Sequence, residues 1–327
     1  MMQVIPAQRG AFRCNYNINR GNQMTRRNFD ILDYISKEEI LKKLEELGSK
    51  ELTKTGHGFS TFGRIPIIQS AEKSTTSYSN KSKEKPAIRL IEVVLAANRN
   101  YNKVVEPNVK KIEEQQPNLK NFSELNELIE NQSQNDFYSF WGHKDEKKYR
   151  TLKNILNKIE QLKKDNPLIS DDFTLMNNWG TKADLSGYKT DIIGAIPNVG
   201  IATFQHLRMV FGVDTIKPDQ RVKEILDYEF GLGKLSDINT IKAVEQIAEI
   251  AESKVITIDQ VFVQYGSSYY NQQANKLTLK QVASNLKNNQ QVNTLKQVAS
   301  NLKKLGVDND TISKATLLTI KQIERIV

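Results

Sequence analysis

Apolar residues recur at three- and four-residue spacing along most of this chain, which is the spacing of amphipathic helices. The cleanest stretch is 150–164, which ends before Asn166-Pro167. Five residues make up its apolar face: Leu152, Ile155, Leu156, Ile159 and Leu162. A second stripe predicts a helix over 235–251, and no run of alternating strands occurs. The pattern therefore predicts an all-α fold.

Shorter helices are predicted from their start and stop signals. Ser36 and Glu39 form the capping signature of a helix over 37–47, which Gly48 ends. Three further stretches are also expected to be helical: the one from Ala87, 123–131 and 255–265. The last of these is apolar and β-branched, so a strand is the alternative, but its surroundings favour a short buried helix.

These elements divide the chain into three regions. Residues 1–28 are polar without periodicity, and 49–86 are rich in Ser, Thr, Lys and Gly, so we expect disorder in the first stretch and a linker in the second. The N-terminal region 1–86 then holds one short helix. Residues 87–270 form the main helical domain, and 271–327 form a basic helical tail.

The tail contains an internal repeat. The ten residues from Thr278 recur from Thr294 with a period of 16. Two copies are too few for a solenoid that stacks on itself. The residues after Leu305 have a helix–turn–helix-like rhythm, which leaves DNA contact and a solvated or self-associating appendage as alternatives. Residues 272–327 carry nine basic and three acidic residues, and so most of the net charge of +9.

The charge favours a polyanion partner such as DNA. An AT-rich genome, which favours lysine and asparagine, is the alternative source of the same charge. No run of about 18 apolar residues occurs, and no basic N-terminal segment leads into an apolar core, so we expect a cytoplasmic protein that does not enter a membrane. Cys14 is the single cysteine and the three histidines are scattered, so no metal site is expected.

A tight turn between two helices is predicted over 196–200. Pro197 fixes one dihedral angle, Asn198 tolerates a left-handed conformation, and Gly200 permits a positive φ and a close approach of the backbone. The first N–H groups of the following helix have no internal partner and can bind a phosphate. Five residues would therefore bind the DNA backbone: Pro197, Asn198, Val199, Gly200 and Thr203. An ordinary helix–helix corner is the alternative.

Residues 196–203 resemble the Leu-Pro-Gly-Val-Gly-x-x-Thr hairpin of the helix–hairpin–helix (HhH-GPD) DNA glycosylase superfamily, the family of endonuclease III and adenine glycosylase. In that family a Gly/Pro-rich loop and a catalytic Asp follow the hairpin. Residues 211–218 are similar to this loop, and Asp219 stands at the Asp position, seventeen residues after Ala202. The resemblance is strongest over 190–226.

The chain departs from the family at two positions in this stretch. Asn198 replaces a glycine of the hairpin, and Glu224 stands where a basic residue is usual. Over its full length, 87–270, the resemblance implies a two-lobed helical domain that excises a base from a flipped nucleotide.

The resemblance makes Asp219 the predicted catalytic residue. As the bond between base and sugar stretches, the sugar becomes cation-like, and a carboxylate stabilises it and orients the attacking water. The start of an ordinary helix is the alternative role for this Asp. The lysine nucleophile of bifunctional members falls at Ala202, so we expect a monofunctional enzyme without a lyase step. Lys217 is expected to contact a phosphate, and replacing that nucleophile is its alternative role.

The resemblance also bears on cofactors and on the flipped base. The first cysteine of the family's iron–sulfur cluster falls at Tyr270, so no cluster is expected, and a monovalent cation at the hairpin is left open. Asn98 falls where members insert a polar residue into the gap left by the base. Glu92 is nearest to the general acid of adenine-specific members. A polar helix terminus is the alternative role for Asn98, and a solvated helix face is the alternative for Glu92.

The expected function is therefore a monofunctional DNA N-glycosylase of the base-excision type. A non-catalytic DNA-binding helix–hairpin–helix module is the alternative, and double-stranded DNA is the partner in both. A self-associating helical adaptor without a role on DNA is a third possibility.

Overall fold

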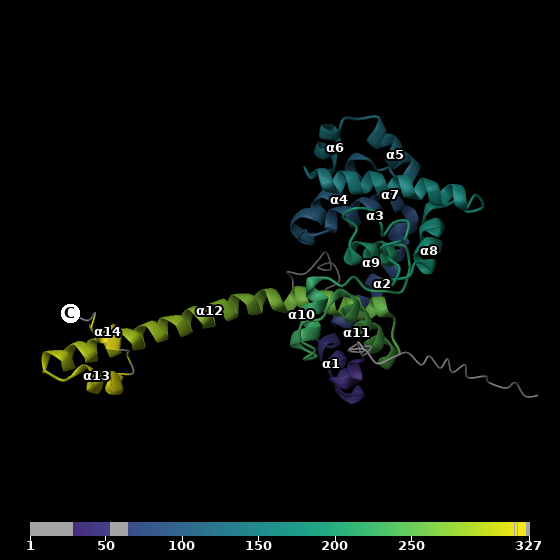
Figure 1. Cartoon of the computed structure of the whole chain (residues 1–327). Coiled ribbons are helices and arrows are strands. Elements are labelled where there is room, and N and C mark those ends of the chain that lie inside the picture. Colours follow the sequence, from purple (N-terminus) through teal and green to yellow (C-terminus); the bar gives the residue numbers. More distant parts are fainter. Residues whose placement is uncertain (1–28, 53–64, 317, 319, 325–327) are drawn as a thin grey trace, which may run out of the picture.

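The computed structural model describes residues 29–52, 65–316, 318 and 320–324, and every regular element among them is a helix (Figure 1). The predicted all-α class is confirmed. No helix of this described part is long and apolar enough to cross a membrane. The expected disorder of 1–28 lies outside the described residues.

One hydrophobic core joins the helices between residues 86 and 210. Their bounds are Pro86–Ala96 (α3), Tyr101–Val105 (the π-helix η3), Glu106–Gln115 (α4), Phe122–Glu130 (α5), Gln134–Trp141 (α6), Glu146–Asp165 (α7), Asp172–Lys182 (α8) and Ile201–Val210 (α9). Every residue of α3 is buried, because α4, α5, α7 and α9 pack around it. In Figure 1, α4 to α7 form the upper part of the molecule.

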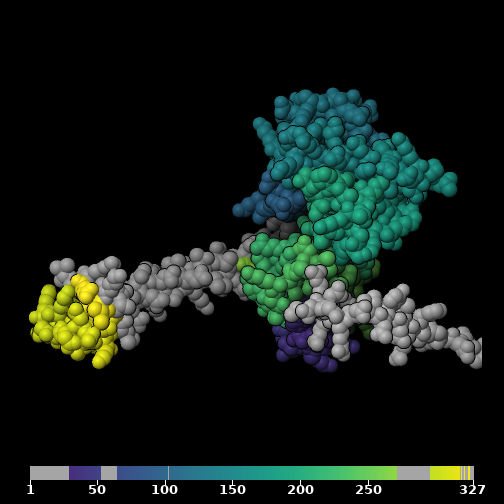
Figure 2. Space-filling view, viewed as in Figure 1, coloured from purple at the N-terminus to yellow at the C-terminus, as the bar shows by residue number. Residues whose placement is uncertain are grey.

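A second core joins elements from both ends of the chain. They are Ile31–Asp33 (η1), Lys37–Gly48 (α1), Ile67–Glu84 (α2), Gln220–Tyr228 (α10), Asp237–Ile250 (α11) and Val255–Lys304 (α12). Figure 2 shows the purple N-terminal residues directly against the green residues of this group. The chain therefore leaves the second core after α2, builds the first core, and returns at α10.

Helix α2 shows that the linker predicted over 49–86 is wrong from residue 67 onward. Its hydroxyl groups donate to carbonyls one turn earlier, Ser74 to Ser70 at 2.8 Å and Thr75 to Ala71 at 2.9 Å, which satisfies them inside the helix. One face packs against α12 and is buried at Ile67, Ser70, Ala71 and Ser74. Tertiary packing thus overrides a composition typical of loops. Residues 53–64 of the same stretch lie outside the described part.

Helix α12 begins where a short helix was predicted but continues through both copies of the tail repeat to Lys304. No proline interrupts these residues. Asn309–Thr316 (α13) and Ile320–Glu324 (α14) follow it (Figure 1). They form a small third core with the end of α12, made by Ala299, Ile312, Leu318 and Ile323.

Candidate functional site

The turn over 196–200 stands on a buried apolar base. Ile196 and Val199 are each 6% exposed, and the other three turn residues are exposed: Pro197, Asn198 and Gly200. The Val199 N–H donates to the Ile196 carbonyl at 3.0 Å, and the Thr151 hydroxyl of α7 donates to the Pro197 carbonyl at 3.3 Å. The exposed backbone of the turn is therefore fixed by the buried side chains of Ile196 and Val199 and by the hydrogen bond from Thr151 of α7.

The left-handed residue of the turn is Asn198, with a φ of 70°. Gly200 has a φ of −89° as the N-cap of α9, so the positive φ that a glycine permits is not used there. Most residue types adopt the conformation found at Gly200. A Cβ atom at Gly200 would meet nothing within 4 Å. The fold therefore has room for a larger side chain at this position, and only a bound partner could require the small size of glycine.

The first turn of α9 presents unpaired backbone N–H groups beside this open surface. The Phe204 N–H donates to the Gly200 carbonyl at 2.9 Å and is the first to bond within the helix. The N–H groups of Ile201, Ala202 and Thr203 have no partner among the described residues, and no side chain caps them. With the partial positive charge of the helix start, they can bind an anion.

Asp219 is the N-cap of α10, and its side chain is half-buried. Its Oδ1 accepts hydrogen bonds from the N–H groups of Arg221 at 2.9 Å and Val222 at 3.2 Å. Within the described part of the chain, its Oδ2 has no hydrogen-bond or ion-pair partner. Asp219 therefore does cap its helix, and one carboxylate oxygen stays available to a ligand.

The loop that carries Lys217 and Asp219 is fixed to both cores. On the first core, the Asn177 amide donates to the Phe211 carbonyl at 2.7 Å. The Gln205 amide of α9 donates to the Thr215 hydroxyl at 2.8 Å. On the second core, the Asp214 carboxylate accepts the N–H of Ile256 in α12 at 2.9 Å. The position of the loop therefore depends on both cores.

Lys148 of α7 connects the predicted site residues, and the sequence analysis missed it. Its Nζ donates to three carbonyls at the end of α3, those of Val94 at 3.1 Å, Leu95 at 2.6 Å and Ala97 at 2.6 Å. Asn98 follows directly, exposed and with a φ of 55°. Thr151, which holds the hairpin, lies one helical turn further along α7. The same edge of α7 thus supports both the Asn98 turn and the hairpin.

Lys148 also lies within electrostatic reach of Lys217. Burial lowers the pKa of Lys148 to about 8, and repulsion by Arg99 and Lys217 adds to the effect, while Asp145 opposes it. Arg99 is in turn 3.8 Å from the Asp145 carboxylate. The basic group formed by Lys148, Arg99 and Lys217 therefore links the Asn98 turn to the loop of Asp219. One sequence signal could have found Lys148: it precedes the core residue Leu152 by four positions, which places both residues on the same face of a helix.

A second carboxylate lies within electrostatic reach of Asp219 and was also missed. Asp259, in the first turns of α12, is 2% exposed. Burial raises the pKa of Asp259 to about 8, and the neighbouring Asp219 charge adds to the increase, while a backbone hydrogen bond from Lys217 opposes it. No motif pointed to Asp259, because its proximity to Asp219 arises only when α12 packs against α10.

Glu92 is buried in a different polar network. It forms an ion pair with Arg89 on the same helix and accepts the Tyr101 hydroxyl at 2.7 Å. The Arg89 guanidinium lies 4.8 Å from the ring centre of Tyr78, whose hydroxyl is 3.0 Å from His206 Nε2. Both oxygens of Glu92 are engaged, and its side chain is not on a solvated face.

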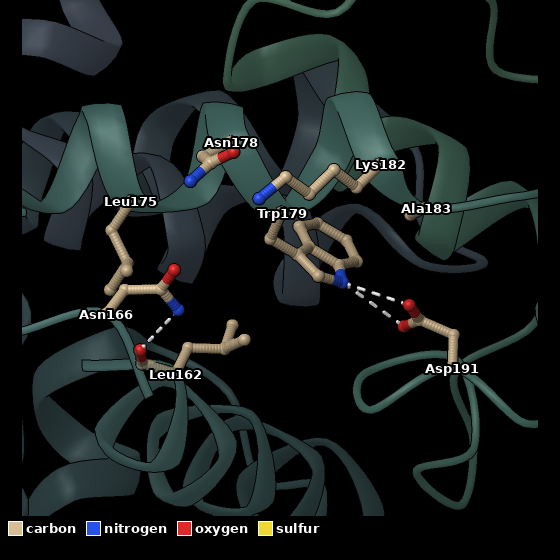
Figure 3. Close-up of a pocket in the computed structure, with 8 residues that line it drawn as sticks. All are labelled: Leu162, Asn166, Leu175, Asn178, Trp179, Lys182, Ala183 and Asp191. Atoms are coloured by element: carbon tan, nitrogen blue, oxygen red, sulfur yellow. Dashed lines mark hydrogen bonds between the residues drawn. The ribbon is translucent and has the colours of Figure 1, made fainter. Parts of the chain in front are cut away.

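The hollow drawn in Figure 3 lies apart from these residues. Its volume is about 170 Å³, and α7, α8 and the following loop supply its lining, with Trp179 donating to both oxygens of Asp191 at 3.2 and 3.1 Å. A second hollow of about 310 Å³ lies beside the hairpin, between Pro197 and Asn154 of α7. Neither hollow includes Asp219.

No protein-family model, no curated protein and no solved structure matches this chain. Within the described residues, no group of three His, Cys, Asp or Glu side chains is placed to hold a metal ion. Cys14 and His57 lie outside those residues.

Proposed function

We propose that this chain binds double-stranded DNA and acts as a monofunctional N-glycosylase, with Asp219 as its catalytic residue. The observation that carries the proposal is the state of the Asp219 carboxylate. It is half-buried, one oxygen is held by two N–H groups of α10, and the other oxygen is unpaired within the described part of the chain.

The DNA backbone would bind at the hairpin. The unpaired N–H groups at the start of α9 bind one phosphate, the open surface at Gly200 lets the strand approach, and Lys217 binds a neighbouring phosphate. Asn98 occupies the gap left by the extruded base, because it is exposed on a turn that Lys148 fixes. These contacts position the strand without reading its sequence. A monovalent cation at the hairpin stays a prediction.

Asp219 would then act on the extruded nucleotide. As the glycosidic bond lengthens, positive charge develops on the deoxyribose, and the ionised carboxylate stabilises it. The unpaired oxygen orients a water molecule for attack on the anomeric carbon and takes its proton. Ala202 offers no amine at the position of the family's lysine, so the product is an abasic site in an intact strand.

A panel of duplexes tests this proposal. Each carries uracil, oxidised guanine, an alkylated purine or mismatched adenine, and alkali reveals the abasic sites. We expect one substrate to be processed, and Asp219→Asn to lower the rate by at least about 100-fold while leaving duplex affinity within about threefold. Asp227→Asn, near the other end of α10, is the matched control and keeps the wild-type rate. Equal product from Asp219→Asn would refute the catalytic assignment.

A non-catalytic DNA-binding module is the second candidate. Capping of α10 by Asp219 accounts for this residue without any chemistry. In this case no substrate of the panel yields product, while salt-sensitive duplex binding persists and survives Asp219→Asn. Lack of duplex binding at low salt would contradict both candidates and favour the adaptor.

A further inference from the structure

Arg99 and His143 meet beside the Asn98 turn, and the proposed mechanism gives neither of them a role. The Arg99 guanidinium donates to His143 Nε2 at 3.4 Å. Because a guanidinium can only donate, Nε2 carries no proton in this arrangement and the imidazole is neutral. The Asp145 carboxylate faces both side chains, with its Oδ2 3.8 Å from each. The turn after α3, the loop after α6 and the N-cap of α7 therefore meet in one polar cluster.

The backbone around His143 is fixed, so its ring has a defined position. The His143 N–H donates to the Tyr138 carbonyl at 3.1 Å, and the His143 carbonyl accepts the indole N–H of Trp141. Gly142, with a φ of 70°, ends α6 between them. The rings of His143 and Trp141 lie beside each other, with 6.3 Å between their centres. The Arg99 side chain, in contrast, is exposed and can reach a ligand.

Positive charge exceeds negative charge in this cluster. Asp145 is the carboxylate that pairs with Arg99 and His143 within the described part of the chain, and its Oδ1 also caps α7. There it accepts the N–H groups of Lys147 at 3.0 Å and Lys148 at 3.2 Å. The Lys148 ammonium, which is fixed at the end of α3, adds further positive charge. A second anion, supplied from outside the chain, would balance the cluster.

We propose that Arg99 and His143 bind one phosphate group of the DNA strand beside the Asn98 turn. The site rests on the proposed function, because Asn98 fills the gap left by the extruded base only if the chain binds DNA in that way. The phosphates that flank the extruded nucleotide then lie close to Asn98, and Arg99 is the next residue in the chain. A guanidinium can donate two parallel hydrogen bonds to one phosphate. His143 takes up a proton from the solvent as the phosphate binds, so that Nε2 changes from acceptor to donor.

Duplexes with single neutralised phosphates test the site. The probe carries one abasic analogue, which offers Asn98 a gap without an identified substrate. One phosphate at a time around the analogue is replaced by an uncharged methylphosphonate. We expect Arg99→Gln to weaken binding of the unmodified probe by about tenfold, and to cost almost nothing on the probe that lacks the charge it contacts. Lys42→Gln, on the exposed side of α1, is the matched control and keeps the wild-type affinity on every probe. An Arg99→Gln penalty that is absent, or equal on every probe, would overturn the proposal.

The pH dependence of binding tests the part of His143. Burial lowers the pKa of His143 in the free chain, repulsion by Lys148 and Arg99 adds to this, and Asp145 opposes it. The side chains of α4 and α6 that contact this loop are uncharged, namely Asn108 and Trp141. A bound phosphate raises the pKa of His143, so the complex holds a proton that the free chain lacks, and the affinity rises as the pH falls.

His143→Gln cannot take up this proton. Between about pH 7.5 and about pH 5.5, we expect the affinity of the wild type for the probe to rise at least about threefold more than that of His143→Gln. Equal pH dependence in the two proteins contradicts the proposed site.

The outcomes separate this site from the proposed function. If the wild type processes no duplex, yet the Arg99→Gln penalty disappears at one phosphate, the glycosylase proposal fails and the phosphate site stands. If the wild type is active and no single phosphate removes the penalty, the site alone fails. A wild type that binds no duplex at low salt refutes both.

Discussion

Lys148 shows how one side chain can stabilise several parts of the site. Its ammonium donates to three carbonyls that α3 would otherwise leave unpaired at its end. We expect Lys148→Met to lower the free energy of unfolding by about 2–3 kcal/mol, because hydrogen bonds to a charged group are lost while the carbonyls stay partly buried. Urea unfolding measures this change. Lys147→Met, at the exposed neighbouring position, should cost less than about 0.5 kcal/mol.

The residues of the candidate site differ in how far the sequence could predict them. Asn198 was predicted to tolerate the left-handed conformation that it adopts, and the start of a helix, where Asp219 lies, was the alternative role given for Asp219. Both local roles depend on nearby backbone alone. Lys148 donates to carbonyls about 50 positions away at the end of α3, and the charge of Asp219 acts on Asp259 from about 40 positions away. Neither interaction leaves a local pattern. The sequence named both Asn198 and Gly200 as residues that could adopt a left-handed conformation, and the turn places it on Asn198.

Helix α2 is the element whose prediction failed, and its buried face can be tested directly. Ala71 is fully buried between α2 and the second core. Ala71→Glu places a charge there without a partner, so we expect a loss of more than about 3 kcal/mol in the free energy of unfolding. Ser77→Glu, on the exposed side of the same helix, should change it by less than about 0.5 kcal/mol. Similar effects of the two substitutions would show that α2 does not pack as described.

The other elements show why α2 was difficult. The helix predicted over 37–47 was found as α1, with Ser36 accepting the Glu39 N–H at 3.3 Å, because a cap and an apolar stripe are local signals. The helix over 150–164 begins earlier, at Glu146, because Asp145 caps it. In α2 the inward face is mostly serine and alanine, which carry little hydropathy contrast. Its helical state depends on the close approach of α12, which becomes clear only in the assembled fold.

For the whole molecule, the distribution of positive charge would decide where the proposed DNA partner binds. If the hairpin side carries the contacts, neutralising one phosphate-binding lysine there should lower the slope of log affinity against log salt by about 0.9. We therefore expect Lys217→Gln to reduce this slope by about one phosphate contact and to weaken binding equally on all sequences. Fluorescence anisotropy of a labelled duplex at several salt concentrations measures both quantities.

The basic tail supplies the matched comparison, because it carries most of the net charge and lies at the far end of α12. Three lysines of the tail, Lys296, Lys304 and Lys314, are exposed. Replacing all three by glutamine removes more charge than Lys217→Gln, yet we expect the slope to stay the same, since charge acts on the counterions only where it meets the phosphates. A drop of two to three units in the triple variant would instead place the tail on the DNA. It would also show that the hairpin is not the main contact.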